Sequence, residues 1–312
     1  MKKTIRLAII GTDSSHSVAF AQLLQDEAHP YHVPGARVIA AYPGGSPDFE
    51  LSRSRVDGFA KRLRDEFGVR LAATPEEAAE GADGVLLLAA DGRKHLELFR
   101  RVAEPGRPVF IDKPLATTYR EAKEIAARAE RLGVPFMTGS SLRYAEDLVA
   151  ALAAAEGSNN EGSDVVDGAD CFGPISMEPT QGGYLWYGIH AAEMLYAAMG
   201  TGCERVTAVS SPGGEHLVGV WPGGRVGTVR GSFEGSEFAA VLHLGAKSVY
   251  VPIKPESKPY YASLLERVIG LFRDGRADRL PTTDESLEII RFLEAANRSR
   301  ESGREVRLHE IE

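Results

Sequence analysis

Short apolar runs alternate with helical patterns through the N-terminal half of the chain, and this alternation limits its possible folds more than any other feature. Each run has the length and composition of a strand buried on both faces. The predicted strands are Leu7–Ile10, Val38–Tyr42, Gly84–Leu88, Val109–Ile111 and Pro135–Thr138. Strands that alternate with helices form βαβ units, so we predict an α/β fold with a Rossmann-like doubly wound parallel sheet over residues 1–139.

Two sequence patterns indicate where helices of this half begin. Thr74 is followed by Pro75 and Glu77, which gives an N-cap, a proline in the first turn and a capping-box acid. Thr118 and Glu121 repeat the capping-box spacing. We therefore expect helices to start after Thr74 and Thr118.

The second half of the chain has closely spaced strands instead. Predicted strands cover 205–210, 216–221, 225–233, 237–244 and 247–252, and predicted helices cover 189–199, 259–273 and 284–302. Short turns between strands are typical of antiparallel sheets. We predict that residues 140–312 form an α+β domain with a large, mostly antiparallel sheet, which binds the substrate and mediates oligomerisation. Residues 156–164 are polar and read as a loop.

Charge and composition exclude several classes of partner. The chain has 36 basic and 44 acidic residues, a net charge of −8, which argues against binding nucleic acid or an anionic membrane. The N-terminal apolar run is too short for a signal peptide, and no run is long enough to span a membrane. The spacing of Cys171 and Cys203 suggests neither a zinc site nor a disulfide, and we expect a cytoplasmic protein.

The segment Pro108–Ala116 contains the first candidate for chemistry. Its strand ends in Asp112 and Lys113, and Pro114 prevents the strand from continuing. Ligands bind at the carboxyl ends of strands in parallel sheets, so Lys113 is a candidate for catalysis or cofactor contact. The alternative is a solvated lysine beside its own aspartate, since most lysine side chains face water.

The first strand-to-helix turn is the expected place for a dinucleotide. A dinucleotide turn has the pattern G-x-G-x-x-G, but here only Gly11 is kept, and Asp13 and His16 replace the other glycines. Ser14 and Ser15 stand at a helix N-terminus, where hydroxyls and N–H groups bind anions. The alternative is a plain N-cap.

The second strand ends at Tyr42 without the usual ribose-binding acid, and the next acid is Asp48. Arg53 and Arg55 follow, and would suit a 2′-phosphate. Both NAD and NADP therefore remain open as cofactors.

Four motifs in order resemble the glucose–fructose oxidoreductase / inositol dehydrogenase / MocA family. Asp112-Lys113-Pro114 is similar to its E-K-P motif, and His95 keeps the histidine of a T-P-x-x-x-H pattern. Arg143-Tyr144 matches an Arg-Tyr pair after the last Rossmann strand. Trp186–His190 matches D-x-G-x-H, with Glu193 as the acid three residues on.

The resemblance implies an NAD(P)-dependent oxidoreductase that acts on a sugar, a polyol or a derivative. Lys113 would lie beside the nicotinamide and orient the substrate oxygen, and His190 would act as acid or base. The implied cofactor-binding residues are Gly11, Thr12, Asp13, Ser14, Ser15, His16, Tyr42, Asp91, His95, Asp112, Lys113 and Pro114. The implied substrate-binding residues are Arg143, Tyr144, Trp186, Tyr187 and His190. No metal is expected.

One departure affects the chemistry. The acid of D-x-G-x-H falls on Trp186, so either His190 or Lys113 acts alone, or Glu193 or Asp91 helps. Two other functions therefore remain open: a cofactor-free protein that binds a small ligand, and a lyase or glycosidase that keeps its cofactor and oxidises transiently.

The aromatic residues near this motif, and the second sheet, allow two further expectations. Tyr184, Trp186 and Tyr187 would stack on a sugar ring or pack in a core. The sheet strands carry apolar residues on both alternations, so we expect a homodimer or homotetramer.

Overall fold

The structure, a computed structural model, describes residues 3–157, 166–254 and 258–312. The chain forms two compact units, which are described one at a time. The first comprises Met1–Ala116, Glu121–Gly139 and Tyr261–Leu280, and the second comprises Thr117–Arg120, Ser140–Tyr260 and Pro281–Glu312. The polar stretch predicted at 156–164 lies almost wholly outside the described residues. The division into domains 1–139 and 140–312 stays a prediction, and the compact units differ from it by placing Tyr261–Leu280 in the first unit.

Among the described residues, the first unit contains a six-stranded sheet in the order β3-β2-β1-β4-β5-β6. Its strands are β1 (Ile5–Ile10), β2 (Ala36–Tyr42), β3 (Arg70–Leu71), β4 (Gly84–Leu87), β5 (Val109–Ile111) and β6 (Phe136–Thr138). All neighbouring pairs are parallel, as predicted. The strand order reverses between β1 and β4, which is the point where such sheets bind ligands.

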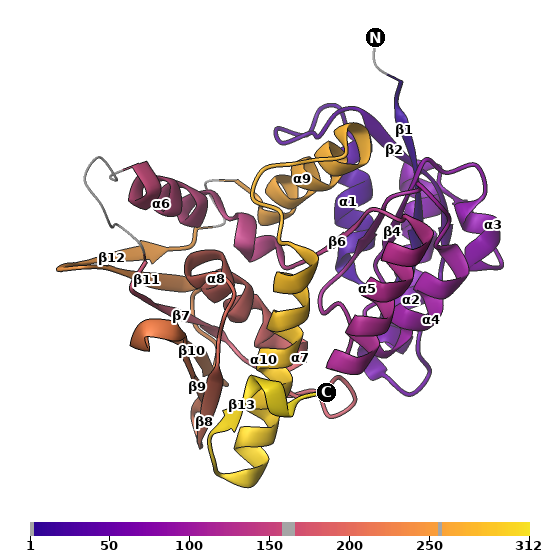
Figure 1. Cartoon of the computed structure of the whole chain (residues 1–312). Helices are drawn as coiled ribbons and strands as arrows, with labels where there is room; N and C mark the ends of the chain where they lie inside the picture. Colours follow the sequence, from indigo (N-terminus) through magenta and orange to yellow (C-terminus); the bar gives the residue numbers. More distant parts are fainter. Residues whose placement is uncertain (1–2, 158–165, 255–257) are drawn as a thin grey trace. The chain divides into compact units, whose positions relative to one another are not determined.

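Helices cover both faces of this sheet (Figure 1). They are α1 (Ser15–Gln25), α2 (Glu50–Phe67), α3 (Pro75–Ala79), α4 (His95–Val102), α5 (Tyr119–Leu132) and α9 (Tyr260–Asp274), with a short 3₁₀ helix η1 (Gly92–Lys94). The chain runs outward in opposite directions from β1 and from β4, so right-handed crossovers place α1 and α2 on one face and α4 and α5 on the other. Thr74 caps α3 as predicted, because its side chain accepts the N–H of Glu77.

Helix α9 joins the first unit from a late part of the sequence and packs beside α1. Its Tyr261 ring meets the rings of His16 and Phe20 edge-on, with centroids 4.6 and 6.0 Å apart. Its Phe272 lies over Gly84 of β4, where a Cβ atom would be only 2.5 Å from the phenyl ring. Because Gly84 has no side chain, α9 can lie directly against the sheet.

Among the described residues, the second unit contains a seven-stranded sheet in the order β12-β11-β7-β10-β9-β8-β13. Its strands are β7 (Gly168–Pro174), β8 (Arg205–Ser211), β9 (Gly214–Val220), β10 (Val226–Ser232), β11 (Ala239–Leu244), β12 (Lys247–Pro252) and β13 (Val306–Arg307). The β7–β10 pair is parallel and the other pairs are antiparallel. The prediction of a mostly antiparallel sheet is therefore confirmed.

One face of this sheet is covered by helices. The helices of the unit are α6 (Glu146–Gly157), α7 (Tyr184–Tyr187), α8 (Ile189–Met199) and α10 (Thr283–Ser302), and its 3₁₀ helices are η2 (Ser141–Tyr144), η3 (Pro222–Gly224) and η4 (Leu308–Glu310). Helix α8 contacts β7 and β10, and α10 contacts β8. Beneath them lie Leu217, Val229 and Leu242, which are almost completely buried. Both cysteines are buried and free, and burial raises the pKa of the Cys203 thiol to about 12.

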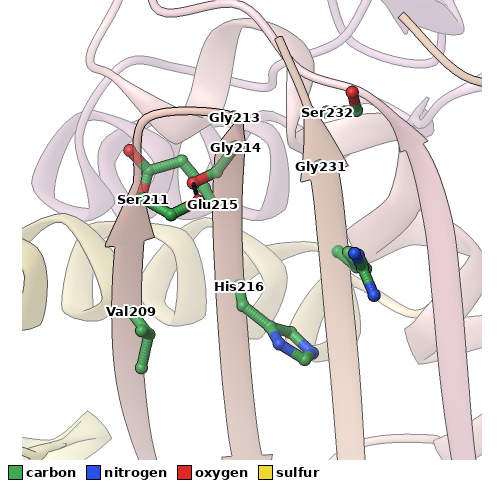
Figure 2. Close-up of a pocket in the computed structure, with 9 residues that line it drawn as sticks. Val209, Ser211, Gly213, Gly214, Glu215, His216, Gly231 and Ser232 are labelled. Atoms are coloured by element: carbon green, nitrogen blue, oxygen red, sulfur yellow. Dashed lines mark hydrogen bonds between the residues drawn. The ribbon is translucent and has the colours of Figure 1, made fainter. Parts of the chain in front are cut away.

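The opposite face of the sheet is open within this unit. Val209 is 58% exposed and Val226 is 43% exposed, which is unusual for valine on the middle strands of a sheet. A hollow of about 380 Å³ lies over β8, β9 and β10. Figure 2 shows Val209 and His216 projecting from the neighbouring strands β8 and β9 in this hollow. One alternation of apolar residues therefore faces the helices, and the other, which includes Val209 and Val226, lies on the open face.

Candidate functional site

The end of β5 holds Asp112 in a buried position with two hydrogen-bond donors. Its Oδ2 atom lies 2.6 Å from Nδ1 of His16, and its Oδ1 atom accepts the backbone N–H of Lys113 at 2.8 Å. Burial alone would raise the pKa of Asp112, but the charge and hydrogen bond of His16, together with the charge and backbone N–H of Lys113, outweigh it, so the pKa lies below its ordinary value. Asp112 therefore remains a carboxylate and ties the turn at Lys113 to helix α1.

Lys113 follows directly and is half-buried. Burial lowers the pKa of its ammonium group, and the neighbouring carboxylate of Asp112 opposes this effect. A lysine of this kind releases its proton more readily than a surface lysine, which is a property of lysines used in acid–base chemistry.

His95 lies inside the unit and links two loops. Its Nδ1 atom is 2.8 Å from the carbonyl oxygen of Pro114, and its Nε2 atom is 2.9 Å from the carbonyl oxygen of Ala89. Carbonyl oxygens only accept hydrogen bonds, so a ring N–H donates to one of these carbonyls. The ring joins the end of β4 to the turn that carries Lys113, and it is completely buried.

The turn after β1 keeps the geometry of a nucleotide turn at its first glycine. Gly11 has φ +91°, and a Cβ atom there would lie 2.5 Å from the Cα of Ala89. Only glycine fits both this backbone angle and this close approach. The N–H of Gly11 is bonded to the carbonyl of Tyr42, and the Thr12 hydroxyl donates to the carbonyl of Val56.

Asp13, at the second glycine position, turns its carboxylate inward. Oδ2 accepts the hydroxyl of Ser52 at 2.6 Å, and Oδ1 accepts the N–H of Ala90 at 3.0 Å. Burial raises the pKa of Asp13, while these two hydrogen bonds oppose the rise. The carboxylate of Asp13 is thus buried inside the first unit. Helix α1 begins next, with Ser14 as its N-cap and Ser15 exposed in its first turn.

Arg93 is a site residue that the sequence reasoning missed. It bonds Asp91 with Nη2 at 2.7 Å and Asp48 with Nη1 at 2.8 Å. These two contacts of Arg93 join the loop after β2 to the loop after β4. No local pattern connects Arg93 with Asp48, because they are 45 residues apart and meet only when β2 and β4 flank β1.

In the second unit, His190 lies in the first turn of α8. Its Nδ1 atom is 2.6 Å from the hydroxyl of Ser140. The rings of Tyr187 and Phe238 meet the imidazole edge-on, with centroids 5.0 and 5.9 Å away. The ring is half-buried and its plane is fixed by these three neighbours.

Arg143 forms a buried ion network that the sequence reasoning did not foresee. Its Nε atom is 2.7 Å from Glu193 on α8, and its Nη2 atom bonds Glu285 on α10. Burial raises the pKa of Glu193, and the charge and hydrogen bond of Arg143 oppose the rise. Tyr144 beside it is completely buried. These contacts serve packing, and the substrate-binding roles expected of both residues stay predictions.

The aromatic residues of α7 divide into two groups. Tyr184 is completely buried, and its hydroxyl donates to Glu215 at 2.6 Å, so this ring packs in the core. Trp186 and Tyr187 are half-buried, and their predicted role in binding a sugar ring stays a prediction. Within the described residues, no group of three or more histidine, cysteine or acidic side chains is placed to hold a metal ion.

Comparison with known proteins finds one family model that matches part of the chain. Residues 5–140 match a family model described as an oxidoreductase family with an NAD-binding Rossmann fold. Over these residues, which are less than half of the chain, it is similar to the glucose–fructose oxidoreductase / inositol dehydrogenase / MocA family. No curated protein matches the sequence significantly. Among the described residues, no helix is long and apolar enough to cross a membrane.

Solved structures of low sequence identity share the fold over nearly the whole chain. A probable dehydrogenase from Thermotoga maritima has 16% identity and a TM-score of 0.76, covering 99% of this chain and 100% of that one. An apo scyllo-inositol dehydrogenase from Lactobacillus casei has 12% identity and a TM-score of 0.78, covering 99% of both chains. GenD2 from gentamicin A biosynthesis, solved with NAD, has 20% identity and a TM-score of 0.77, covering 98% and 97%.

The geometry of the first turn shows whether its residues fit a dinucleotide. Gly11 supplies the close turn, and Ser14 and Ser15 leave hydroxyls at the N-terminus of an 11-residue helix. Asp13 would repel phosphates if it faced them, but its carboxylate is turned inward onto Ser52 and Ala90. His16 fits at the third glycine position because its ring bonds Asp112 and packs edge-on against Tyr261. The residues present therefore fit a dinucleotide at this turn.

Proposed function

We propose that the protein is an NAD-dependent oxidoreductase that interconverts a hydroxyl and a carbonyl group on a sugar, polyol or related small molecule. The observation that carries the proposal is the turn at Gly11, whose backbone angle and close approach to Ala89 are those that a dinucleotide turn needs. The match of residues 5–140 to the NAD-binding family model and the fold shared with solved dehydrogenases support it.

The residues of the turn would bind the phosphates. The hydroxyls of Ser14 and Ser15 and the N-terminal N–H groups of α1 favour an anion there. The bound nicotinamide would supply or accept the hydride. The protein's own part is then to bind the substrate, orient its reacting oxygen and exchange a proton with it.

Lys113 and His190 are the side chains proposed for that proton chemistry. Lys113 follows the strand end at Asp112, and its pKa is lowered by burial despite the neighbouring carboxylate. His190 is fixed by Ser140, Tyr187 and Phe238. Glu193, considered above as a replacement for the acid at Trp186, is already paired with Arg143. The proposal therefore assigns the proton chemistry to Lys113 and His190.

We propose NAD rather than NADP as the cofactor because of the charged side chains near the end of β2. Asp48 and Asp91 carry two negative charges against the single positive charge of Arg93. A ribose 2′-phosphate adds negative charge and would be repelled by this excess. Of the two arginines that the sequence offered for a 2′-phosphate, Arg53 is paired with Glu50 and Arg55 is exposed on α2.

Calorimetric titration with NADH and NADPH tests the proposal, followed by assay of a panel of polyols and aldoses with whichever nucleotide binds. NADH is expected to bind more tightly than NADPH. Asp48→Ala should reduce that preference, while Asp57→Ala on the exposed side of α2 serves as the control.

A cofactor-free protein that binds a small ligand is the second candidate. The specific observation in its favour is the side chain of Asp13 at the second glycine position, where a dinucleotide needs close backbone approach. The same titration separates the two functions, because this candidate predicts no nucleotide binding at any concentration used.

A further inference from the structure

We propose that Asp13 is a positioning residue for the nucleotide: its buried carboxylate holds, through the hydroxyl of Ser52, the backbone of Ser46 in the loop after β2 (residues 43–49). All of these contacts lie within the first unit. Their meaning for binding rests on the proposed function. The expectation from the glycine pattern is thereby reversed, because Asp13 supports the nucleotide site instead of obstructing it.

Asp13, Ser52 and Ser46 form a chain of hydrogen bonds. The hydroxyl of Ser52 donates to Oδ2 of Asp13 at 2.6 Å, and its oxygen accepts the N–H of Ser46 at 2.7 Å. All three residues are almost completely buried. A serine hydroxyl has one proton and two lone pairs, so it can donate to the carboxylate and accept the N–H at the same time. The carboxylate therefore orients the hydroxyl, and the hydroxyl oxygen fixes the loop at Ser46.

The start of the same loop is bonded to the turn after β1. The N–H of Thr12 donates to the carbonyl oxygen of Pro43 at 2.9 Å, and the N–H of Gly11 donates to the last residue of β2 at the same distance. Asp13 adds a third attachment, at Ser46 in the middle of the loop. Gly11 and Thr12 use backbone groups for these bonds, whereas Asp13 uses a side chain that glycine lacks.

The loop lies where dinucleotide-binding sheets meet the adenosine ribose, after the second strand. No acid follows β2 before Asp48, and both carboxylate oxygens of Asp48 are bonded to Arg93. The loop then has mainly its backbone to present to the ribose. A flexible backbone would weaken binding, because the nucleotide would have to order it. By holding Ser46, Asp13 keeps the loop ordered before the nucleotide binds.

Glycine at position 13 would break this arrangement. Asp13→Gly removes the acceptor of the Ser52 hydroxyl and of the Ala90 N–H. A buried donor without an acceptor is costly, so Ser52 would turn to another acceptor and release Ser46. The variant that restores the second glycine of the dinucleotide pattern should therefore bind a nucleotide less tightly than the wild-type protein.

Amide hydrogen exchange of the whole chain without nucleotide, followed by NMR, tests the positioning. Exchange at Ser46 requires its N–H to leave Ser52, so the rate reports how firmly the loop is held. Asp13→Gly and Ser52→Ala should each raise this rate roughly tenfold, the effect of about one net hydrogen bond. Exchange of the β1 amides should stay unchanged, which separates release of the loop from a general loss of stability.

Ser54→Ala, at an exposed serine of the same helix, is the control and should exchange like the wild-type protein at Ser46. A wild-type rate at Ser46 in Asp13→Gly would overturn the inference. An unprotected Ser46 amide in the wild-type protein would overturn it whether or not the variants fold.

Calorimetric titration with NADH tests the consequence for binding. Asp13→Gly and Ser52→Ala should each bind NADH roughly tenfold more weakly than the wild-type protein, and Ser54→Ala should bind it equally well. The variant with both changes should lose no more affinity than either single variant, because both break the same chain of bonds, whereas independent structural effects would add.

Tighter binding of NADH by Asp13→Gly would overturn the inference, since it would show that the Asp13 carboxylate hinders the nucleotide. Failure of the wild-type protein to bind any nicotinamide nucleotide would instead refute the proposed function. Exchange at Ser46 would then still decide whether Asp13 holds the loop.

Discussion

The Nδ1 atom of His16 lies 2.6 Å from Oδ2 of Asp112. A histidine that replaces a glycine of the dinucleotide pattern is thus bonded to an acid of a second motif. His16 occupies the third glycine position of the first turn, and Asp112 is the acid of the D-K-P motif. Both are buried, and the ring also stacks on Phe20 and meets Tyr261 edge-on. The histidine is therefore part of how α1, α9 and β5 pack together.

Removing His16 should destabilise the first unit strongly. His16→Ala leaves the buried Asp112 carboxylate without its partner, and loss of one member of a buried pair costs about 3–5 kcal/mol. Urea unfolding followed by circular dichroism measures the loss. The exposed His309→Ala is the control, and equal stability of the two variants would show that the pair contributes nothing.

The Asp112 carboxylate also predicts how stability depends on acid. Its folded pKa lies below its ordinary value, so its contribution is complete above the unfolded pKa of about 3.9 and is lost as pH falls through the folded value. Asp112→Asn should therefore be less stable near neutral pH and show a shallower loss of stability from about pH 4 downward. Urea midpoints measured from neutral to acidic pH check this, and equal slopes for both proteins would refute it.

Lys113 should matter for turnover much more than for folding. Lys113→Ala is expected to keep the melting temperature within a few degrees, because a solvent-reaching lysine adds little stability. Turnover should fall by roughly 10²–10⁴-fold, the usual loss for a positioned proton-transfer group. Lys113→Arg should not restore it, since a guanidinium does not release its proton.

The exposed Lys123→Ala provides the control for Lys113. Steady-state kinetics beside thermal unfolding separates the two effects. Normal turnover and nucleotide binding in Lys113→Ala would mean that this lysine has no part in function.

Arg143 distinguishes packing from substrate binding. Arg143→Met removes the partner of Glu193 and Glu285, so we expect a loss of about 3–5 kcal/mol in the free energy of unfolding. Chemical denaturation measures it. A variant with unchanged stability and a raised KM would instead favour the substrate-binding role predicted from the sequence.

The open face of the second sheet is expected to associate with a second copy of the chain. Val209, His216 and Arg230 lie side by side across β8, β9 and β10, and Val226 lies on the same face. Exposed apolar side chains on a sheet of this size commonly mark an interface. Sedimentation at micromolar concentration should show a dimer or tetramer, which Val209→Asp weakens and Val209→Thr preserves.

The sequence predicted most strands and helices because their hydrophobic periods were clear. Strand β7 was missed because Gly168 and Gly173 break the pattern of a strand, and both are needed where Val226 and Phe238 approach. Helix α2 was missed because its surface is mostly polar. The place of α9 in the first unit depends on contacts between distant segments, such as Phe272 with Gly84, which no local pattern contains.

Candidate side chains were easier to name than their partners. Lys113 and His190 were found from motifs, but the inward turn of Asp13 depends on Ser52, which is 39 residues away. The contact between Ser140 and His190 likewise spans 50 residues. Such pairs form only after the fold has brought the segments together, and no local spacing reports them.

Calorimetric titration of the wild-type protein with NADH tests the central claim most directly. We predict saturable binding at one site per chain, weakened in a Gly11→Ala variant, because an added Cβ atom would lie 2.5 Å from the Cα of Ala89 and move the turn. Absence of heat with NAD, NADH, NADP and NADPH alike at millimolar concentration would contradict it, since the proposed reaction needs a bound hydride carrier.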